Sequence, residues 1–424
     1  VMASGAAPTV LKFLRKHLLP YGLVPVQGGG AGGKSEERAA EGKNEKLQPG
    51  SVLCISLMSG DLDLTASGTV TEVRDDKIYG FGHSFMGMGE ADYPMSVGEA
   101  LFVYPSRYIS FRVGAPLKEV GRLTWDEMAG VVGRVGPKRS RMVPVEVEVL
   151  GPDDKSRRVY KYRVIHHRLL SSSLVTTAFI NSLFARSALP QDVTLRYSVR
   201  IEIDGHEPVV LENISSGPSS MFMIMIQIMG TTSLLMNNAI EPLRLKAVQT
   251  KIEVIPKTRL SIIRSVRALK NAVRPGQSMP VEIILRTYRG PDVRLVEDVP
   301  IPADLPSGTY RLTVCGGSEN LREEMRELPG RYNPRTISDM LWILRRDEPM
   351  DNLFFRLHLP AGKGLAIEGS ELPNLPGSIS AIIGQTGREV SSIRQPRVTR
   401  KQLDMLLSGF RNVMIPVDDR APRN

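Results

Sequence analysis

The sequence predicts a mainly β protein with α-helical additions, and three observations lead to this fold class. Short runs rich in Val, Ile and Leu recur along the chain between turns that contain Gly, Pro, Asn or Asp. Few segments show the helical spacing of apolar residues. The hydrophobic share of 42% and the charged share of 24% exclude a disordered chain, a collagen and a coiled coil. A length of 424 residues predicts two or three domains.

Residues 1–48 are predicted to form a helix and a linker. The segment 8–18 starts with a proline, which a first helical turn tolerates, and then carries apolar residues at helical spacing. Residues 27–33 are rich in glycine and residues 34–46 in charge, which indicates a flexible linker. A phosphate-binding loop is not expected, because Gly33-Lys34-Ser35 leads into two glutamates rather than into an apolar helix.

Residues 49–255 are predicted to form a β region with an embedded helix over 169–188. The expected strands are 52–57, 62–67, 68–73, 77–81, 101–113, 121–123, 143–150, 158–164 and 193–203. The most apolar run, 221–229, has about half of the roughly 20 residues that a membrane span needs. We therefore interpret it as a buried strand or a core helix and expect no membrane span.

Residues 256–317 are predicted to form a β-sandwich of immunoglobulin type, because short strands recur there at regular spacing between Pro and Gly turns. Residues 318–424 are predicted to form a mixed α/β region. The elements expected within 256–317 include a hairpin of strands 281–288 and 293–299 and a strand over 309–314. Those expected within 318–424 are helices over 319–328 and 336–346 and one or two strands after Asn352.

The composition also narrows the chemistry. Lys plus Arg number 55 and Asp plus Glu 45, so the net charge is +10. This charge would suit nucleic acid, but the basic residues are scattered, which indicates a solvated surface and no nucleic-acid partner. Cys54 and Cys315 make neither a disulfide framework nor a zinc site. The six histidines form no His-x-x-x-His pair, so we expect neither a metal nor a cofactor.

His83 is the candidate functional residue. It lies in the glycine-rich segment Tyr79-Gly-Phe-Gly-His-Ser-Phe-Met-Gly-Met-Gly89, directly after an expected hairpin strand. Glycine suits backbone that turns sharply or lies close to another group. A histidine on such a loop can be presented to a cleft, whereas a structural histidine is the alternative interpretation. We predict that His83 faces a cleft and is not packed into an apolar core.

Several blocks of the sequence resemble the SpoIVB-type serine peptidase domain, in particular the large bacterial proteins that carry this domain. Two blocks together are fairly specific, Ser59-Gly-Asp-Leu-Asp-Leu-Thr-Ala-Ser-Gly-Thr-Val-Thr-Glu-Val73 and Gly80-Phe-Gly-His-Ser-Phe-Met-Gly-Met-Gly89. Further blocks are Ala91-Asp-Tyr-Pro-Met95, Gly130-Val-Val-Gly-Arg134, Asn213-Ile-Ser-Ser-Gly-Pro218 and Leu372-Pro-Asn-Leu-Pro376. The resemblance covers the chain from about Pro49 to about Pro376.

The resemblance implies a chymotrypsin-like β-barrel, in which His83 is the general base of a serine endopeptidase with a protein substrate. In that role, the imidazole takes the proton of the attacking serine and returns it to the leaving amine. The nucleophile motif of the family, Gly-x-Ser-Gly-Ser-Pro, is absent from this sequence. Neither Ser215-Ser-Gly-Pro218 nor Gly230-Thr-Thr-Ser233 matches it. Ser84 is a second departure, because the relatives more often carry proline there.

Three aspartates near the histidine in sequence are candidates to orient an imidazole. Asp92 is preferred, ahead of Asp61 and Asp63. Each of the three also has a structural interpretation, since Asp61 follows a turn glycine, Asp63 alternates outward and Asp92 precedes a strand.

Two hypotheses about function follow from the missing serine. In the large relatives the serine motif precedes the histidine block, so here it would lie before Val1. The chain is then the His-bearing portion of a peptidase-like protein that processes itself, with its serine on an upstream segment or another subunit. The alternative is a non-catalytic structural or assembly protein that retains the fold. The resemblance places either one in the bacterial cell envelope or periplasm. Under the first hypothesis, the barrel within 49–255 is expected to expose a strand edge.

Overall fold

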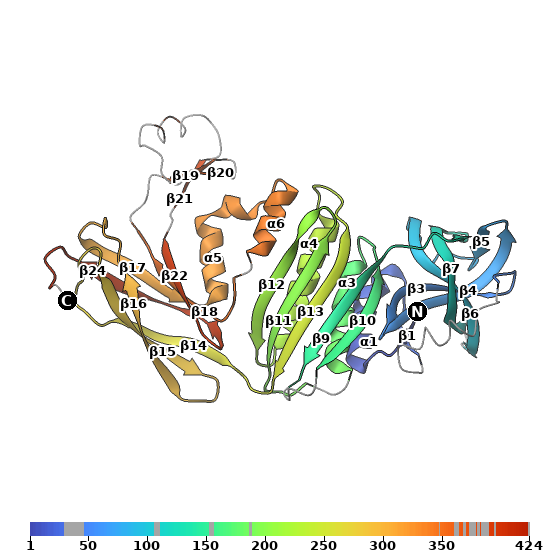
Figure 1. Cartoon of the computed structure of the whole chain (residues 1–424), viewed down its shortest axis with the longest axis horizontal. Helices are drawn as coiled ribbons and strands as arrows, with labels where there is room; N and C mark the ends of the chain where they lie inside the picture. Colours follow the sequence, from blue (N-terminus) through green and yellow to red (C-terminus); the bar gives the residue numbers. More distant parts are fainter. Residues whose placement is uncertain are drawn as a thin grey trace. The chain divides into compact units, whose positions relative to one another are not determined.

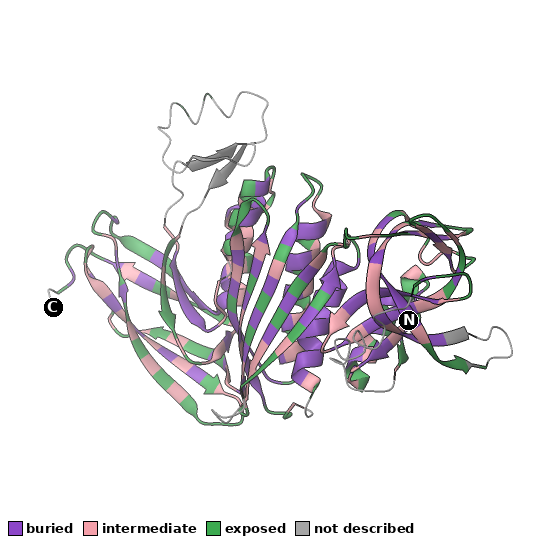
Figure 2. Ribbon diagram, turned by 45° about the vertical axis from the view of Figure 1, so that its right-hand side comes forward, coloured by how far each residue is buried: buried purple, intermediate pink, exposed green. Residues whose placement is uncertain are grey.

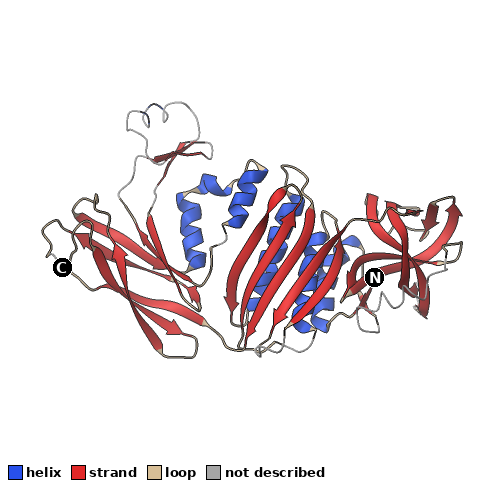
Figure 3. Ribbon diagram, viewed as in Figure 1, coloured by secondary structure: helices blue, strands red, loops and turns tan. Residues whose placement is uncertain are grey.

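The structure is a computed structural model, and it describes residues 1–28, 46–105, 111–151, 157–185, 189–346, 348–359, 364–367, 370–372, 379, 382, 390–393 and 396–422. The described chain is mainly β, as the sequence predicts (Figure 1; Figure 3). It divides into two compact units. Unit 1 contains residues 1–189, 198–210 and 222–253, and unit 2 contains residues 190–197, 211–221 and 254–424.

The elements of the first half of the chain are β1 (Met2–Ser4), α1 (Pro8–Leu18), β2 (Val26–Gln27), β3 (Val52–Gly60), β4 (Asp63–Arg74), β5 (Lys77–Gly80), β6 (Gly89–Tyr104), β7 (Phe111–Glu127), β8 (Gly130–Val135), β9 (Met142–Leu150), β10 (Arg158–Ile165), α3 (Ser171–Phe184), β11 (Thr194–Ile203) and β12 (His206–Ser216). Those of the second half are α4 (Ser220–Asn237), β13 (Leu245–Ile255), β14 (Leu260–Ala268), β15 (Ser278–Thr287), β16 (Asp292–Pro300), β17 (Gly308–Cys315), α5 (Gly317–Glu327), α6 (Ile337–Arg345), β18 (Asn352–Leu357), β19 (Gly364–Ile367), β20 (Ser370–Leu372), β21 (Val390–Ile393), β22 (Arg397–Gln402), β23 (Leu406–Ser408) and β24 (Phe410–Val417).

Six strands of unit 1 form a closed barrel. The antiparallel ladder runs from β3 to β4, β5, β8, β7 and β6, and β6 returns to β3. The expectation of an open barrel that needs another half is therefore wrong. The β6–β7 hairpin explains the closure, because its strands of 16 and 17 residues contain several register shifts. Such bulges bend a strand and increase its twist, so the ladder can curl back to its first strand.

β3 also joins the barrel to the rest of the same sheet. Beyond Met58 it pairs with β10, and the ladder continues through β9, β13, β11 and β12. Side chains along β13 alternate between buried and exposed (Figure 2). This pattern is typical of a sheet with one covered face. α3 and α4 lie on the same face of this part of the sheet (Figure 1).

α3 is a core helix and confirms the helix expected over 169–188. All of its residues from Ser171 to Leu183 are buried. A helix with this many hydroxyls can be buried because the hydroxyls donate back to the preceding turn. Thr176 Oγ1 donates to the Ser172 carbonyl at 2.8 Å, and Thr177 Oγ1 donates to the Ser173 carbonyl at 2.7 Å.

α4 is longer than the apolar run that predicted it. The helix continues through Gly230-Thr-Thr for 18 residues, so the chain does contain a segment long and apolar enough to cross a membrane. The helix is thus longer than the sequence indicated. The expectation of no membrane span stays a prediction, because a core helix of a soluble protein passes the same test of length and composition. In this helix, 39% of the residues are buried. Phe222, Ile226 and Leu234 lie exposed on it.

Two four-stranded sheets of unit 2, β16-β15-β14-β23 and β22-β18-β17-β24, share one apolar core. The core joins Val281 and Ile283 of β15 to Leu312 of β17 and Phe355 of β18. The expected hairpin is confirmed as β15–β16, and the two helices expected over 319–328 and 336–346 are confirmed as α5 and α6. This pair of sheets includes strands after residue 317, because β24 pairs with β17 along the whole of both strands.

Three local predictions turn out differently. The single strand expected over 101–113 is the end of β6 and the start of β7, and residues 106–110 lie outside the described residues. The two strands expected over 62–73 form one strand, β4, because its pairing with β3 continues through Gly68. The predicted linker falls mostly on residues 29–45, outside the described residues, whereas Val26 and Gln27 pair with β1.

Candidate functional site

His83 lies on the loop between β5 and β6, on the barrel. Its side chain is exposed, so the prediction that it avoids an apolar core is confirmed. His83 does not line any of three cavities seen in the described part of the chain, and its position in a cleft stays a prediction. Phe81, Gly82 and Gly87 have φ angles of 71°, 72° and 68°. Glycine adopts positive φ without strain, which explains Gly82 and Gly87, whereas Phe81 is one of few described non-glycine residues with this conformation.

Asp126 of β7 holds this loop in place. Its carboxylate is 1% exposed and accepts three backbone N–H groups. Phe85 donates to Oδ1 at 2.7 Å, and Met86 and Gly87 donate to Oδ2 at 2.7 and 2.8 Å. Hydrogen bonds to a charged acceptor are stronger than neutral ones, so Asp126 fixes the course of the loop. Sequence reasoning missed this residue, because 39 to 41 positions separate it from its partners.

The hydrogen bond of His83 determines which ring nitrogen is free. Nδ1 lies 2.7 Å from the Ser84 carbonyl oxygen. A carbonyl oxygen only accepts, so Nδ1 carries the proton, and in the neutral ring Nε2 keeps its lone pair. Within the described residues, the Ser84 carbonyl is the only hydrogen-bond partner of the His83 side chain. Nδ1 is thus held by a backbone carbonyl, and among the described residues no hydroxyl or thiol is hydrogen-bonded to the ring.

The candidate acids lie elsewhere. Asp92 pairs with Arg122 at 3.2 Å and accepts the backbone N–H of Arg141. Asp61 accepts the backbone N–H of Lys161 at 2.6 Å, and Asp63 accepts that of Gly60 at 3.2 Å. None of the three is bonded to His83, so the preference for Asp92 as its local partner is not supported.

Ser215, Ser216 and the two cysteines are poor candidates for a nucleophile. Ser215 and Ser216 are buried, and Ser216 Oγ accepts the backbone N–H of Arg259 in unit 2. Burial raises the pKa of the Cys54 thiol to about 12 and that of Cys315 to about 12. Both thiols are therefore protonated at neutral pH and are poor nucleophiles.

The two most specific sequence blocks meet in the barrel. A Cβ on Gly68 would lie 2.1 Å from Cδ1 of Phe81, so the Phe81 ring occupies the space that a side chain would take. The Phe81 ring contacts Phe85, which contacts Tyr93, and Tyr93 contacts His167. The ring centroids of these pairs are 5.9 to 6.2 Å apart. The glycine of the first block therefore makes room for the aromatic residue that precedes His83.

We expect Gly68→Val to displace the Phe81 ring and to destabilise unit 1 by about 1–3 kcal/mol, the usual cost of forcing atoms into a packed site. Thermal unfolding followed by circular dichroism measures the change. Gly205→Val serves as a control for a glycine with open space around it, although its φ of 73° adds local strain. A Gly68→Val protein as stable as the unmodified protein would show that Phe81 moves aside freely.

A second candidate site is a basic cavity of about 380 Å³ in unit 1. Its lining residues are Glu90, Ala91, Asp92, Arg122, Lys138, Arg139, Arg141 and His166. Four cationic side chains thus face two carboxylates. Burial is the largest cause that lowers the pKa of His166. The nearby Arg141 and Arg244 also lower this pKa, whereas Asp92 raises it. We did not anticipate this cavity from the sequence, because the net charge was attributed to scattered surface residues.

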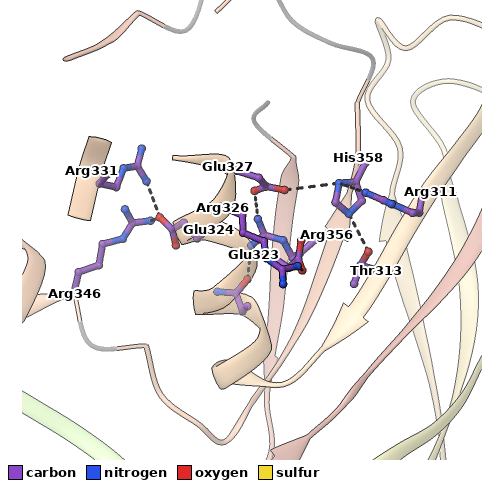
Figure 4. Close-up of polar contacts among 11 residues, drawn as sticks. Arg311, Thr313, Glu323, Glu324, Arg326, Glu327, Arg331, Arg346, Arg356 and His358 are labelled. Atoms are coloured by element: carbon purple, nitrogen blue, oxygen red, sulfur yellow. Dashed lines mark hydrogen bonds and ion pairs between the residues drawn. The ribbon is translucent and has the colours of Figure 1, made fainter. Parts of the chain in front are cut away.

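A third polar cluster lies in unit 2, around a cavity of about 440 Å³ (Figure 4). Arg356 is 2% exposed, donates to Asn320 at 2.5 Å and pairs with Glu327. Glu324 of α5 bridges Arg331 and Arg346 at 2.7 and 2.9 Å. Each buried carboxylate is paired, which favours a structural role for this cluster.

His358 belongs to the same cluster. Its Nε2 lies 2.9 Å from Thr313 Oγ1, and its Nδ1 lies 3.8 Å from Glu327 Oε1. Burial lowers the pKa of His358 to about 4, and Arg311 and Arg356 add to the shift. His358 is therefore neutral at pH 7. Among the described residues, no three His, Cys, Asp or Glu side chains are grouped so that they could hold a metal ion.

Comparison with known proteins adds no family. No protein-family model, no curated protein and no solved structure matches the chain.

Proposed function

We propose that the chain is the His-bearing portion of a SpoIVB-type serine peptidase-like protein, with His83 as the general base. The observation that carries this proposal is the state of the His83 ring. Nδ1–H is bound to the Ser84 carbonyl, and the exposed Nε2 is free to accept a proton. A serine hydroxyl within hydrogen-bonding distance of Nε2 would complete the base–nucleophile pair.

In this role the Ser84 carbonyl does what an orienting carboxylate does in a triad, since it holds Nδ1–H and selects the tautomer. A neutral carbonyl stabilises a positive charge less than a carboxylate does, so we expect slower catalysis than with a complete triad. The serine would come from an upstream segment or another subunit, and the barrel does not need that segment to close. A protein substrate and a location in the bacterial cell envelope or periplasm are parts of the same proposal.

The second candidate is a non-catalytic structural or assembly protein that retains the barrel. Two observations favour it. Within the described residues, no serine or carboxylate is bonded to His83. In addition, the six-stranded barrel is closed, so its fold is retained without a second half. Under this alternative, the glycine loop and Asp126 are structural features of the barrel.

A fluorophosphonate probe separates the two candidates. We expect no labelling of residues 1–424 alone, because loss of a triad member costs about four or more orders of magnitude in rate. In the complex purified from its native cells, the peptidase proposal predicts a labelled chain with the Gly-x-Ser-Gly-Ser-Pro motif. His83→Gln should abolish that labelling, whereas Arg74→Gln, at an exposed residue of β4, should not.

Each outcome favours one candidate. Absence of labelling in the native complex would support the non-catalytic protein. Strong labelling of residues 1–424 alone, lost on a single Ser→Ala change, would show that the nucleophile lies within this chain.

A further inference from the structure

We propose that the basic cavity of unit 1 binds a small molecule through a phosphoryl or sulfuryl group. The cavity volume of about 380 Å³ lies within the range of small-molecule sites, roughly 300–1,000 Å³. It is larger than one tetrahedral anion needs, so the anionic group is expected to belong to a larger ligand. His83 does not line this cavity, and the proposed binding does not depend on the proposed peptidase function.

The cavity lining has an excess of positive charge, since four cationic side chains stand against the carboxylates of Glu90 and Asp92. Arg122 is paired with Asp92 at 3.2 Å, and Arg139 lies 3.7 Å from Glu119. For the part of the chain that the structure describes, neither Lys138 nor Arg141 has a side-chain ion pair. A lining in which cations outnumber carboxylates favours an anionic ligand.

One buried polar atom of the lining also lacks a partner. Among the described residues, His166 Nε2 has no hydrogen-bond partner. Buried polar atoms without a partner are uncommon in proteins, and each calls for a water, an ion or a ligand. A ligand oxygen in the cavity would supply that partner.

The mixture of donors indicates the kind of anion. The lining offers an ammonium, guanidinium groups and an imidazole, which belong to different residues. A tetrahedral group with three acceptor oxygens can satisfy several of them together, whereas a planar carboxylate offers two oxygens in one plane. We therefore assign a phosphoryl or sulfuryl group rather than a carboxylate.

The binding of an anion in this cavity is expected to be coupled to protonation of the His166 imidazole. It is surrounded by Asp92 of β6, Arg141 before β9, Arg244 before β13 and its neighbour His167. Burial and the two arginines keep its imidazole neutral, because they lower its pKa. A bound dianion favours the imidazolium form, so binding takes up a proton, and affinity rises as the pH falls.

Titration calorimetry of the full chain with sodium sulfate tests the site, because sulfate keeps its charge across the pH range of a histidine. We expect Lys138→Gln and Arg141→Gln each to weaken sulfate binding about tenfold, the effect of one lost charge-assisted hydrogen bond. Both side chains are exposed, so the fold should be unaffected. Arg74→Gln, which removes the same charge outside the cavity, should bind as the unmodified chain does. Equal affinity in the Lys138→Gln/Arg141→Gln double variant would overturn the proposal.

The pH dependence of the sulfate affinity is a second test. A variant that only lowers the positive charge of the cavity would weaken binding without changing this dependence. Sulfate affinity should rise from about pH 8 to about pH 5, and His166→Gln should flatten this rise. A pH dependence that is unchanged in His166→Gln would contradict the role of this imidazole.

Flotation with phosphatidylcholine vesicles, with and without phosphatidic acid, identifies the source of the group. Binding to phosphatidic acid that is lost in the double variant would show a lipid phosphate, and sulfate binding without flotation would show a soluble ligand. Binding to neither would overturn the site.

Discussion

Replacement of Asp126 by Asn is expected to destabilise unit 1 by about 2–4 kcal/mol and to loosen the loop that carries His83. The carboxylate is almost fully buried and accepts the backbone N–H groups of Phe85, Met86 and Gly87. Asn has one acceptor oxygen, and its amide group places a donor opposite a donor. At least one buried N–H then loses its partner, which costs about 1–3 kcal/mol, and the remaining bonds lose the charge of the acceptor.

Urea denaturation measures the stability, and amide hydrogen exchange at Phe85, Met86 and Gly87 reports on the loop. Asp76→Asn is the matched control, because Asp76 is half-exposed and pairs with Arg134 at the surface. Such pairs contribute about 0–1 kcal/mol. If Asp126→Asn left both the unfolding midpoint and the exchange of the three amides unchanged, Asp126 would not be the anchor of the loop.

Replacement of Arg356 by Met is expected to destabilise unit 2 by about 3–5 kcal/mol at pH 7. Arg356 is buried on β18, and its guanidinium neutralises Glu327 of α5 (Figure 4). Removal of one member of a buried ion pair leaves the other charged in a poorly solvated place. The pKa of Glu327 is already raised by burial, and Arg356 holds it down. Without Arg356 this pKa rises further.

The pH dependence of the Arg356→Met deficit follows from this shift. A carboxyl group whose folded pKa lies above its unfolded value loses stability as the pH rises through that interval. The deficit should therefore be small near pH 4 and largest at pH 7. At low pH the protonated imidazole of His358, whose Nδ1 lies 3.8 Å from Glu327 Oε1, also reduces the deficit, because it places a positive charge beside the carboxylate.

Two further variants separate loss of the charge pair from loss of packing. In the double variant Arg356→Met/Glu327→Leu, both charges are gone, and most of the stability at pH 7 should return. Arg326→Met removes an exposed arginine that pairs with Glu323 and should cost about 0–1 kcal/mol. A deficit of the same size at pH 4 and pH 7, unrelieved in the double variant, would show that the cost comes from packing.

Local patterns in the sequence predicted much of the secondary structure. The helix over 169–188 and the hairpin of β15 and β16 were predicted, because apolar periodicity and turn residues act over a few positions. The end of a strand is less clear when hydrophobic and aromatic residues continue beyond it, which is why 101–113 was predicted as one strand. The length of α4 was missed because Gly230-Thr-Thr interrupts the apolar run without ending the helix.

The candidate site likewise has some features that the sequence predicts and others that depend on the tertiary structure. The sequence by itself determined that His83 lies on a glycine-rich loop after a strand, since positive φ at Gly82 and Gly87 is a local demand. Only the tertiary structure decided which acid serves that loop, because Asp126 reaches it through β6–β7 pairing and not through proximity along the chain. Barrel closure and the gathering of Asp92, Arg141 and His166 around one cavity are likewise long-range. Strand register brings such residues together, and register depends on pairing between segments that are distant in the sequence.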